Sequence, residues 1–333
     1  MTKVKAGIIG LGVGEKHIDG YRASDAAEVI ALCDSDPAKR DMAKKKYPDC
    51  RVYDNAEALI DDPDVTVVSV ASYDHQHAAQ VVRALDCGKH VFSEKPLCTS
   101  EEDYVSIRRA LVRNPGRRLS TNTVLRMSER FRDVHARIRA GDLGQLYCVE
   151  ADYNYGRLHK VLDGWRGDIA DYSVMLGGGV HMVDLLLWLT GSGIVEVSAV
   201  GNKICSAGAK FTTPDMVVAW LKFGNGAIGK VGVNFGCVQP HFHRVLLYGT
   251  KATFENALPS ALLYRSRDAS MPPEKIESAY PGVDKGDLLP SFVDAILGRG
   301  LALVEEADVF AAMSACLAIE RSLRTGKPEH VRN

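Results

Sequence analysis

The sequence has no excess of charge of either sign, because 41 basic residues are balanced by 42 acidic ones in a chain of 333. A chain without strong net charge has no general attraction for nucleic acid or for an anionic membrane surface, so we expect neither partner. Long apolar runs are missing as well. The longest, at 216–221, is far shorter than the roughly 20 residues that a helix needs to cross a bilayer. Both absences argue against a nucleic-acid-binding or membrane-spanning protein.

Paired cysteine motifs are also absent. The eight cysteines are scattered through the chain without a CxxC pair, and several lie inside apolar runs. Such cysteines are typical of buried free thiols. The first apolar segment begins almost at once, with no charged-then-apolar leader before it. We therefore expect a protein of the reducing cytoplasm. With 46% apolar and 25% charged residues, a chain of this length can form two domains with full cores.

What the sequence does contain begins with a glycine-rich turn near the N-terminus. An apolar run at 4–9 leads into alternating glycines and then into helix-compatible sequence. This order is typical of a site for a dinucleotide pyrophosphate, which binds the free amides of the helix start. The spacing departs from G-x-G-x-x-G because Glu15 stands where the third glycine is usual, so a tight turn without a ligand is the alternative. The cofactor-binding residues predicted here are Gly10, Gly12, Val13 and Gly14.

An acidic residue follows the second predicted strand, at 28–33. Asp34 lies about 20 residues after the glycines, where a carboxylate accepts hydrogen bonds from the adenosine ribose of NAD and disfavours the 2′-phosphate of NADP. We therefore predict NAD, although Lys39 and Arg40 are close enough in sequence to keep NADP possible. Asp36 has the simpler predicted role of capping the helix that follows it.

Strands and helices then alternate, as in an open parallel α/β sheet. The helix that ends at Ile60 is expected to be capped by Asp54. After the strand expected at 65–70 come three polar residues at the carboxyl edge, where such sheets bind ligands. We predict that they contact the cofactor: Ser72, His75 and His77. A metal site is not expected, because two histidines need further ligands that the sequence does not place beside them.

The strand expected at 90–93 ends in Glu94-Lys95-Pro96, where proline stops the strand and leaves Lys95 at the carboxyl edge. The next strand, at 117–122, ends in Asn122 and closes the first domain. Together with the glycine turn, the segment 71–77 and Gly88-Lys89-His90-Val91, these residues resemble the glucose-fructose oxidoreductase, inositol dehydrogenase and MocA (Gfo/Idh/MocA) family. The resemblance implies that Lys95 is the active-site cation, touching the reacting hydroxyl and the nicotinamide ribose. It also implies that Glu94 and Asn122 lie beside the cofactor.

The rest of the sequence, 123–333, predicts a second domain dominated by strands. They are expected at 146–155, 195–204, 216–223, 227–235 and 244–249, with a Gly-Asn-Gly hairpin turn at 224–226. Helices are expected at 128–140, 288–297 and 305–325, the last resembling the family's terminal helix, which packs against the first domain. The predicted fold is therefore an N-terminal Rossmann domain at 1–122, followed by an α+β domain with a large, mainly antiparallel open sheet.

A long polar loop is expected at 156–172, and it suits a segment that closes over a polyhydroxy ligand. An ordinary surface loop is the alternative. Basic side chains in this loop and at Arg126 could bind a phosphate, a carboxylate or a nucleotide diphosphate through charge-assisted hydrogen bonds. The predicted substrate-binding residues are Arg126, Tyr155, Arg157, Trp165, Arg166, Asp168 and Asp184.

A second chemical group begins the helix expected after the glycine triplet at 177–179. His181 and Asp184 are expected on one face of this helix, with apolar residues on the opposite face. A histidine near neutral pH can take or return the proton of a reacting hydroxyl, although a lone histidine on an apolar helix is usually a core residue. The family has a histidine and an aspartate at this separation, which favours catalysis for His181.

One position departs from the family pattern. The family commonly has an aspartate four residues before the histidine, and Gly177 stands there in this chain. Asp168 or Asp171 from the preceding loop could substitute for it. Lys95 and His181 are therefore the two predicted catalytic residues.

The resemblance extends over nearly the whole chain, and it implies an NAD(P)-dependent dehydrogenase or reductase of a sugar, a cyclitol or a nucleotide sugar. Two alternatives stay open: a glycosidase that recycles its bound NAD, and a ligand-sensing regulator. Retention of Lys95 and His181 argues against the regulator. An antiparallel sheet with helices on one face leaves the other face exposed, and in this family subunit pairing covers it. We therefore expect a homodimer or a homotetramer.

Overall fold

The computed structural model describes residues 3–169, 171–210 and 212–332. The chain divides into two units, each made of two stretches of chain. Unit one consists of Met1–Val124 and Val283–Val309, and unit two of Leu125–Gly282 and Phe310–Asn333. The division differs from the predicted one in its second half. Residues 283–309 belong with unit one, whereas most of the terminal helix belongs with unit two.

Six parallel strands form the sheet of unit one, in the order β3-β2-β1-β4-β5-β6. The strands are β1 (Val4–Ile9), β2 (Ala27–Cys33), β3 (Arg51–Tyr53), β4 (Val67–Val70), β5 (His90–Ser93) and β6 (Leu119–Thr121). The central strands are buried along nearly their whole length, as expected for a sheet covered on both faces. The predicted Rossmann sheet is confirmed, and the chain crosses between its halves at β1 and β4.

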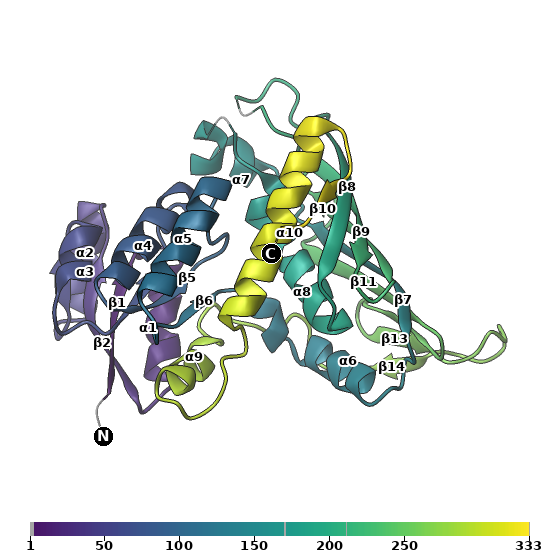
Figure 1. Ribbon diagram of the computed structural model, residues 1–333, viewed down its shortest axis with the longest axis horizontal. Coiled ribbons are helices and arrows are strands. Elements are labelled where there is room, and N and C mark those ends of the chain that lie inside the picture. The colour runs from purple at the N-terminus through teal and green to yellow at the C-terminus, as the bar shows by residue number, and fades with distance from the viewer. Residues whose placement is uncertain (1–2, 170, 211, 333) are drawn as a thin grey trace. The chain divides into compact units, whose positions relative to one another are not determined.

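Helices cover both faces of this sheet. They are α1 (Gly14–Arg22), α2 (Pro37–Lys46), α3 (Ala56–Asp61), α4 (His77–Asp86), α5 (Glu101–Arg113) and α9 (Leu289–Ile296). Right-handed connections put α1 on one face and α3, α4 and α5 on the other (Figure 1). The later helix α9 packs beside α1, and its Phe292 ring lies 5.6 Å from the Phe92 ring of β5. A Cβ on Gly20 of α1 would overlap the carbonyl oxygen of Gly286, so glycine permits this close approach.

The helix caps of unit one agree with the prediction in one case and differ in another. Asp36 accepts a hydrogen bond of 2.9 Å from the Ala38 N–H and caps α2, as predicted. The prediction of Asp54 as the cap of α3 was wrong. Asn55 directly precedes that helix and accepts the Ala58 N–H at 2.8 Å, because it is the residue within reach of the free amides.

Unit two contains a nine-stranded sheet in the order β14-β13-β12-β11-β7-β10-β9-β8-β15. The strands are β7 (Leu146–Asn154), β8 (Ile194–Asn202), β9 (Met216–Phe223), β10 (Ile228–Asn234), β11 (Phe242–Gly249), β12 (Thr253–Glu255), β13 (Ala261–Tyr264), β14 (Glu274–Ile276) and β15 (Glu329–His330). Neighbours are antiparallel except for the parallel pair β7 and β10, which confirms a mainly antiparallel sheet. The four shortest late strands, β12 to β15, were not predicted.

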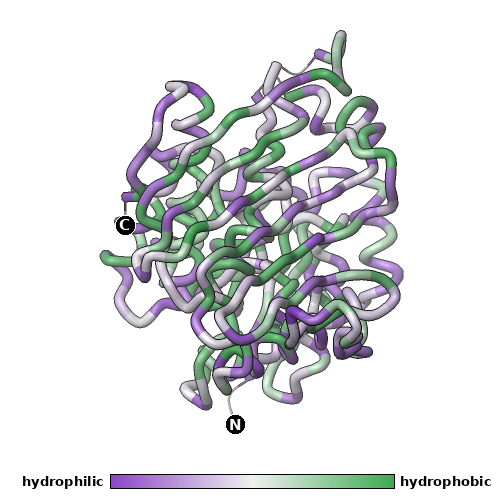
Figure 2. Tube along the Cα trace, turned by 90° about the vertical axis from the view of Figure 1, so that its right-hand side faces the viewer, coloured by the Kyte–Doolittle hydropathy of each residue, from purple (hydrophilic) through white to green (hydrophobic). Residues whose placement is uncertain are grey.

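The helices of unit two are α6 (Glu129–Arg139), α7 (His159–Leu162), α8 (Val180–Thr190) and, from Phe310 onwards, α10 (Glu306–Thr325). Helix α8 packs on β7, and the Ala199 N–H of β8 donates to Ser322 Oγ of α10 at 2.9 Å. Residues of β7 alternate between a buried face and a more exposed one. Figure 2 shows this sheet with hydrophilic and hydrophobic residues mixed along its strands.

The cysteines only partly follow the prediction. All eight are free, and Cys33, Cys98 and Cys316 are buried, but Cys87 and Cys205 are exposed. Across the described ranges, no helix is both long and apolar enough to cross a membrane.

Candidate functional site

The glycine turn of unit one has the geometry of a phosphate-binding loop. Gly10 follows β1 with a φ of +89°, and a Cβ there would overlap the carbonyl oxygen of Ala71, which follows β4. A Cβ on Gly12 would instead meet only Lys39 Nζ, at 3.9 Å. Gly12 therefore leaves space above the backbone that a cofactor pyrophosphate can enter, next to the free amides at the start of α1.

The irregular spacing of the third glycine has a structural explanation. Gly14 is the first residue of α1, and a Cβ there would lie 2.9 Å from Ile8 Cγ2. It therefore provides the close helix-to-strand packing that the third glycine usually provides. Glu15 points away and accepts a charge-assisted bond of 2.6 Å from Lys46 on α2. Val13 precedes the helix and is exposed.

Asp34 lies at the end of β2 and is buried against the glycine turn. Its Oδ2 accepts the Leu11 N–H at 2.7 Å, and its Oδ1 accepts the Asp36 N–H at 2.9 Å. Lys39 Nζ lies 3.3 Å from Oδ2. The carboxylate therefore shapes the turn, and it stands where a ribose hydroxyl can share its acceptor oxygens. Arg40 donates to the Asp34 carbonyl at 3.0 Å.

The three polar residues after β4 have different environments. His77 is buried, with Nδ1 2.7 Å from the Pro96 carbonyl oxygen and Nε2 3.1 Å from the Ser72 carbonyl oxygen. It thus connects the β4 edge to the segment after β5. The Ser72 hydroxyl donates to Gln80 at 2.7 Å. His75 is exposed and stacks on Tyr73, with ring centroids 6.1 Å apart. Ser72 and His77 are hence held by protein contacts, while His75 lies on the surface.

A buried polar network supports the end of β5. Asn122 Nδ2 donates to Glu94 Oε1 at 2.7 Å and to the Lys285 carbonyl oxygen at 2.9 Å. His17 Nε2 lies 3.3 Å from the same Glu94 oxygen. Burial alone would raise the pKa of Glu94, but the nearby Lys285, His17 and Lys95 outweigh it and hold this pKa below its ordinary range. Glu94 is therefore an ionised carboxylate next to the half-buried Lys95.

This network includes two residues that the sequence did not reveal. His17 shares a buried face of α1 with Gly14 and Tyr21, so helical periodicity could have indicated it. Lys285 comes from the second stretch of unit one and had no local signal. Within the described part of the chain, Asn122 Oδ1 is buried without a hydrogen-bond partner. Such an atom suits contact with a bound cofactor, because buried acceptors are normally satisfied.

In unit two, His181 lies at the start of α8, directly after a π-helical turn at Met175–Gly179. Its side chain is 5% exposed, and its ring stacks on Tyr153 of β7 with centroids 6.1 Å apart. His181 and Asp184 both lie in α8, as expected, and their face of the helix is buried like the apolar face. Helix α8 is buried on nearly all sides, and Asp184 is 1% exposed.

Tyr153, which stacks on His181, is surrounded by further aromatic and histidine side chains. Its ring centroid lies 5.0 Å from that of His241 and 5.4 Å from that of His243. His243 Nδ1 is 2.7 Å from the Tyr280 hydroxyl, whose pKa burial raises to about 12. Sequence reasoning missed these histidines. His241 lies just before β11, and His243, in β11, pairs with Tyr153 in the sheet register.

Arg126 and Asp184 form a buried bidentate ion pair. Arg126 Nε donates to Asp184 Oδ2 at 2.9 Å, and Nη2 donates to Oδ1 at 2.7 Å. Their side chains are only 4% and 1% exposed. The guanidinium also lies 5.9 Å from the centroid of the Trp188 ring. These two predicted substrate-binding residues thus bind each other.

The predicted loop at 156–172 is partly ordered by α7 and a 3₁₀ turn at Trp165–Asp168. Arg166 Nε donates to the Tyr172 hydroxyl at 3.1 Å, and its guanidinium lies 4.5 Å from the Trp165 ring centroid. Arg157 is exposed, and its guanidinium lies 5.5 Å from the centroid of the Tyr155 ring. The basic and aromatic side chains of this loop therefore form pairs with one another.

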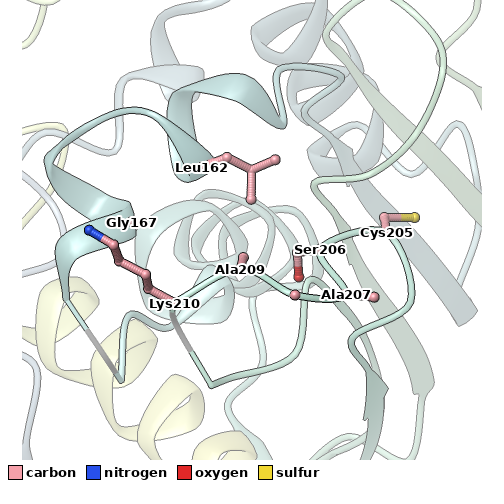
Figure 3. Close-up of a pocket in the computed structure, with 8 residues that line it drawn as sticks. Leu162, Gly167, Cys205, Ser206, Ala207, Ala209 and Lys210 are labelled. Carbon is pink, nitrogen blue, oxygen red and sulfur yellow. The ribbon is translucent and has the colours of Figure 1, made fainter.

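A cavity of about 250 Å³ lies between this loop and the segment 205–210. Leu162 and Gly167 line one side, and Ser206 and Lys210 line the other (Figure 3). Asp168 is exposed and pairs with Lys210 at 3.5 Å. Among the residues that can be described, no three histidine, cysteine or acidic side chains are grouped as a metal site.

Comparison with known proteins agrees with this geometry. Residues 4–123 match the family model described as oxidoreductase family, NAD-binding Rossmann fold, and residues 131–255 match the GFO/IDH/MocA C-terminal domain. The chain belongs to the Gfo/Idh/MocA family of oxidoreductases. Its N-terminal domain, residues 4–123, therefore binds NAD, and the glycine turn and Asp34 fit that cofactor.

Gfo/Idh/MocA relatives with curated names are similar over part or nearly all of the chain. Inositol 2-dehydrogenase of Acidothermus cellulolyticus is 31% identical over 65% of this chain, a match that spans less than two thirds, 62%, of that protein. Inositol 2-dehydrogenase of Ralstonia nicotianae is 26% identical over 98% of this chain and 96% of its own. The WlbA dehydrogenase from Bordetella pertussis, solved with NADH and UDP-GlcNAcA, has the same fold. Its TM-score is 0.83 at 21% identity, over 99% of each chain.

Proposed function

We propose that the protein is an NAD-dependent dehydrogenase that oxidises a CH–OH group of a cyclitol or a sugar, or reduces the corresponding ketone. Membership of the family and the named inositol 2-dehydrogenases support the proposal. The observation that carries it is that one chain contains both a lysine at the cofactor sheet and a histidine suited to proton transfer. Unit one has Lys95 at the carboxyl edge of an NAD-binding sheet, and unit two has His181 at a helix start among aromatic and histidine side chains.

Unit one would bind the cofactor and polarise the reacting oxygen. The amides at the start of α1 bind the pyrophosphate, and Asp34 accepts hydrogen bonds from the adenosine ribose. NAD, when bound, takes or returns a hydride at its nicotinamide ring. Lys95 donates a hydrogen bond to the reacting oxygen, and the ionised Glu94 lies beside it.

His181 would move the proton in the same step. As the hydride leaves the carbon with both electrons of its C–H bond, the hydroxyl proton passes to His181 and a C=O bond forms. In the reducing direction the histidine returns that proton. The neighbouring Tyr153 ring fixes the orientation of the imidazole through stacking, and burial keeps that tyrosine protonated by raising its pKa.

The engaged arginines favour an uncharged ring as the substrate. Arg126 binds Asp184, and Arg166 binds the Tyr172 hydroxyl, so these two predicted anion-binding residues already have protein partners. Tyr155 stacks against Tyr153 and Phe235 with centroids 5.8 Å and 4.6 Å away. Ring faces of this kind pack well on the C–H face of a cyclitol or sugar.

A substrate screen with NAD tests this function. Purified protein is mixed with free cyclitols and sugars, uronates, sugar phosphates and nucleotide sugars, and the absorbance of reduced nicotinamide is followed. We expect stable NADH formation with an uncharged polyol. Sugar release without net NADH would indicate the recycling glycosidase instead. Ligand binding without either reaction would indicate a regulator.

We also propose that unit two mediates homodimer or homotetramer formation through the exposed face of its sheet. Trp220 is 59% exposed and Ile228 is 54% exposed on neighbouring strands β9 and β10, which are large apolar surfaces for a monomer. Lys230 of β10 forms an ion pair of 2.9 Å with Asp152 of β7. Free thiols at all eight cysteines suit the predicted cytoplasmic location.

A further inference from the structure

The position one turn before His181 is filled by a side chain from elsewhere in the loop. Gly177 lies four residues before His181, and residues at that separation lie on the same side of a helix. A Cβ on Gly177 would overlap the hydroxyl oxygen of Tyr172. The space that a side chain at position 177 would occupy thus contains a phenolic oxygen.

Tyr172 is held firmly in this place. Its side chain is buried, and Arg166 Nε donates to its hydroxyl oxygen at 3.1 Å. The Thr213 hydroxyl donates to its carbonyl oxygen, and the edge of the Trp165 ring meets its ring with centroids 6.2 Å apart. A tyrosine hydroxyl can accept from an arginine and donate its own proton at the same time. Tyr172 is therefore a fixed group able to donate a hydrogen bond.

The two carboxylates that the sequence offered for this place lie elsewhere. Asp168 is exposed and pairs with Lys210, which lines the cavity, at 3.5 Å (Figure 3). Asp171 is exposed as well. Among the described residues of the loop, the overlap at Gly177 identifies Tyr172 by geometry.

We propose that Tyr172 orients the reacting hydroxyl of the substrate toward His181, taking the place of a side chain at position 177. The inference rests on the proposed dehydrogenase function. In this arrangement the Tyr172 hydroxyl donates to the substrate oxygen that loses its proton, and Arg166 keeps the phenolic oxygen in position. The group is neutral, so it does not itself stabilise a proton on His181 by charge, as an aspartate at position 177 would.

The first test is Tyr172→Phe, which removes one oxygen and keeps the ring. We expect kcat/KM for the polyol to fall about tenfold or more, because a substrate hydrogen bond is lost, with an unchanged Kd for NAD. Tyr264→Phe is the matched control, since Tyr264 lies on β13 and its hydroxyl donates to Glu255 at 3.4 Å. A Tyr172→Phe enzyme with wild-type kcat/KM and pH profile overturns the proposal.

The second test moves the polar group back to the helix. Gly177→Asp alone should be impaired because its side chain collides with the Tyr172 hydroxyl. In Tyr172→Ala the space is free, so Tyr172→Ala/Gly177→Asp should recover activity relative to Tyr172→Ala. A carboxylate near His181 raises the histidine pKa, so the acidic limb of the oxidation profile should move to higher pH. No recovery and no shift, in a folded double variant, would contradict the proposal.

The wild-type enzyme distinguishes failure of this inference from failure of the proposed function. If wild type oxidises no polyol with NAD, the proposed function is wrong and the assignment of Tyr172 fails with it. If wild type is active and Tyr172→Phe is equally active, only the assignment of Tyr172 is wrong. Melting temperatures of all variants, measured on the same preparations, separate lost orientation from lost folding.

Discussion

The buried pair of Arg126 and Asp184 yields a sharp prediction about stability. Asp184→Asn keeps the shape of the side chain but removes its charge, leaving the Arg126 guanidinium 4% exposed and without its counter-ion. Breaking a buried ion pair from one side typically costs about 3–5 kcal/mol, because the remaining charge is not compensated. Since native proteins are stable by roughly 5–15 kcal/mol, this loss is a large share of the total.

The double replacement should behave differently. Arg126→Met together with Asp184→Leu removes both charges and fills the space with apolar atoms. Replacing a whole buried pair in this way is often close to neutral, so we expect the double variant to lie within about 2 kcal/mol of wild type. The single substitutions Arg126→Met and Asp184→Leu would therefore show a large coupling energy in a double-mutant cycle.

Urea unfolding followed by tryptophan fluorescence measures these effects. Trp188 is a convenient reporter, because its ring lies 5.9 Å from the Arg126 guanidinium and stacks on His135 with centroids 4.0 Å apart. All three tryptophans belong to unit two, so the signal reports the unit that contains the pair. The free energy of unfolding and the slope against urea are compared for wild type, Asp184→Asn, the two single variants of the cycle and the double variant.

One result would refute this reasoning. If Asp184→Asn keeps wild-type stability within about 1 kcal/mol and instead raises KM for the polyol, the pair is a substrate-binding element. The sequence-based assignment of both residues would then be right, and their mutual contact would open when the substrate binds.

Further predictions concern chemistry, cofactor choice, pH and assembly. Lys95→Met should abolish turnover with little change in the Kd for NAD. His181→Ala should lower the rate of single-turnover hydride transfer by about 100- to 10,000-fold. Normal turnover in a less stable His181→Ala protein would show that His181 is a structural residue of the core. NAD should bind more tightly than NADP, and Lys39→Ala should increase this difference in affinity by weakening the binding of NADP. A tenfold preference for NADP, about 1.4 kcal/mol, would contradict the role of Asp34. Burial and two neighbouring arginines lower the pKa of His90 to about 4, below its unfolded value, so its contribution to stability is present above about pH 6.5 and is lost as the pH falls toward 4. Allowing for its partial exposure, lowering the pH from about 7 to 5 should cost about 1 kcal/mol more in wild type than in His90→Asn, as measured by urea unfolding. Trp220→Glu should shift the mass seen by light scattering toward the monomer, and a monomeric wild type at micromolar concentration would contradict the proposed assembly.

The Rossmann unit could be predicted well because its signals are local. Apolar runs followed by Gly10, Asp34 and Glu94 mark the ends of β1, β2 and β5, and parallel connections bring those ends to one edge of the sheet. Lys285 could not be predicted. It reaches the same network only because a distant stretch of chain returns to this unit.

The candidate site in unit two shows a different limit. Arg126 and Asp184 were each plausible ligands for a substrate when considered alone, but the sequence could not show that they bind each other. Gly177 revealed that a side chain was missing, yet a glycine carries no information about what fills its space. The answer, Tyr172, depends on the path of the loop, which periodicity does not describe. His243 was overlooked because strand pairing across the sheet gives it its neighbours.

The chain passes between the two units three times, after Val124, after Gly282 and after Val309. During synthesis, the NAD-binding unit therefore lacks α9 until nearly the whole polypeptide has left the ribosome. Until then the Phe92 ring and the α1 surface that contacts α9 have no cover, and the Asn122 amide has no Lys285 carbonyl to bind. A nascent chain cut off before residue 283 would thus expose apolar surface in the part that was made first.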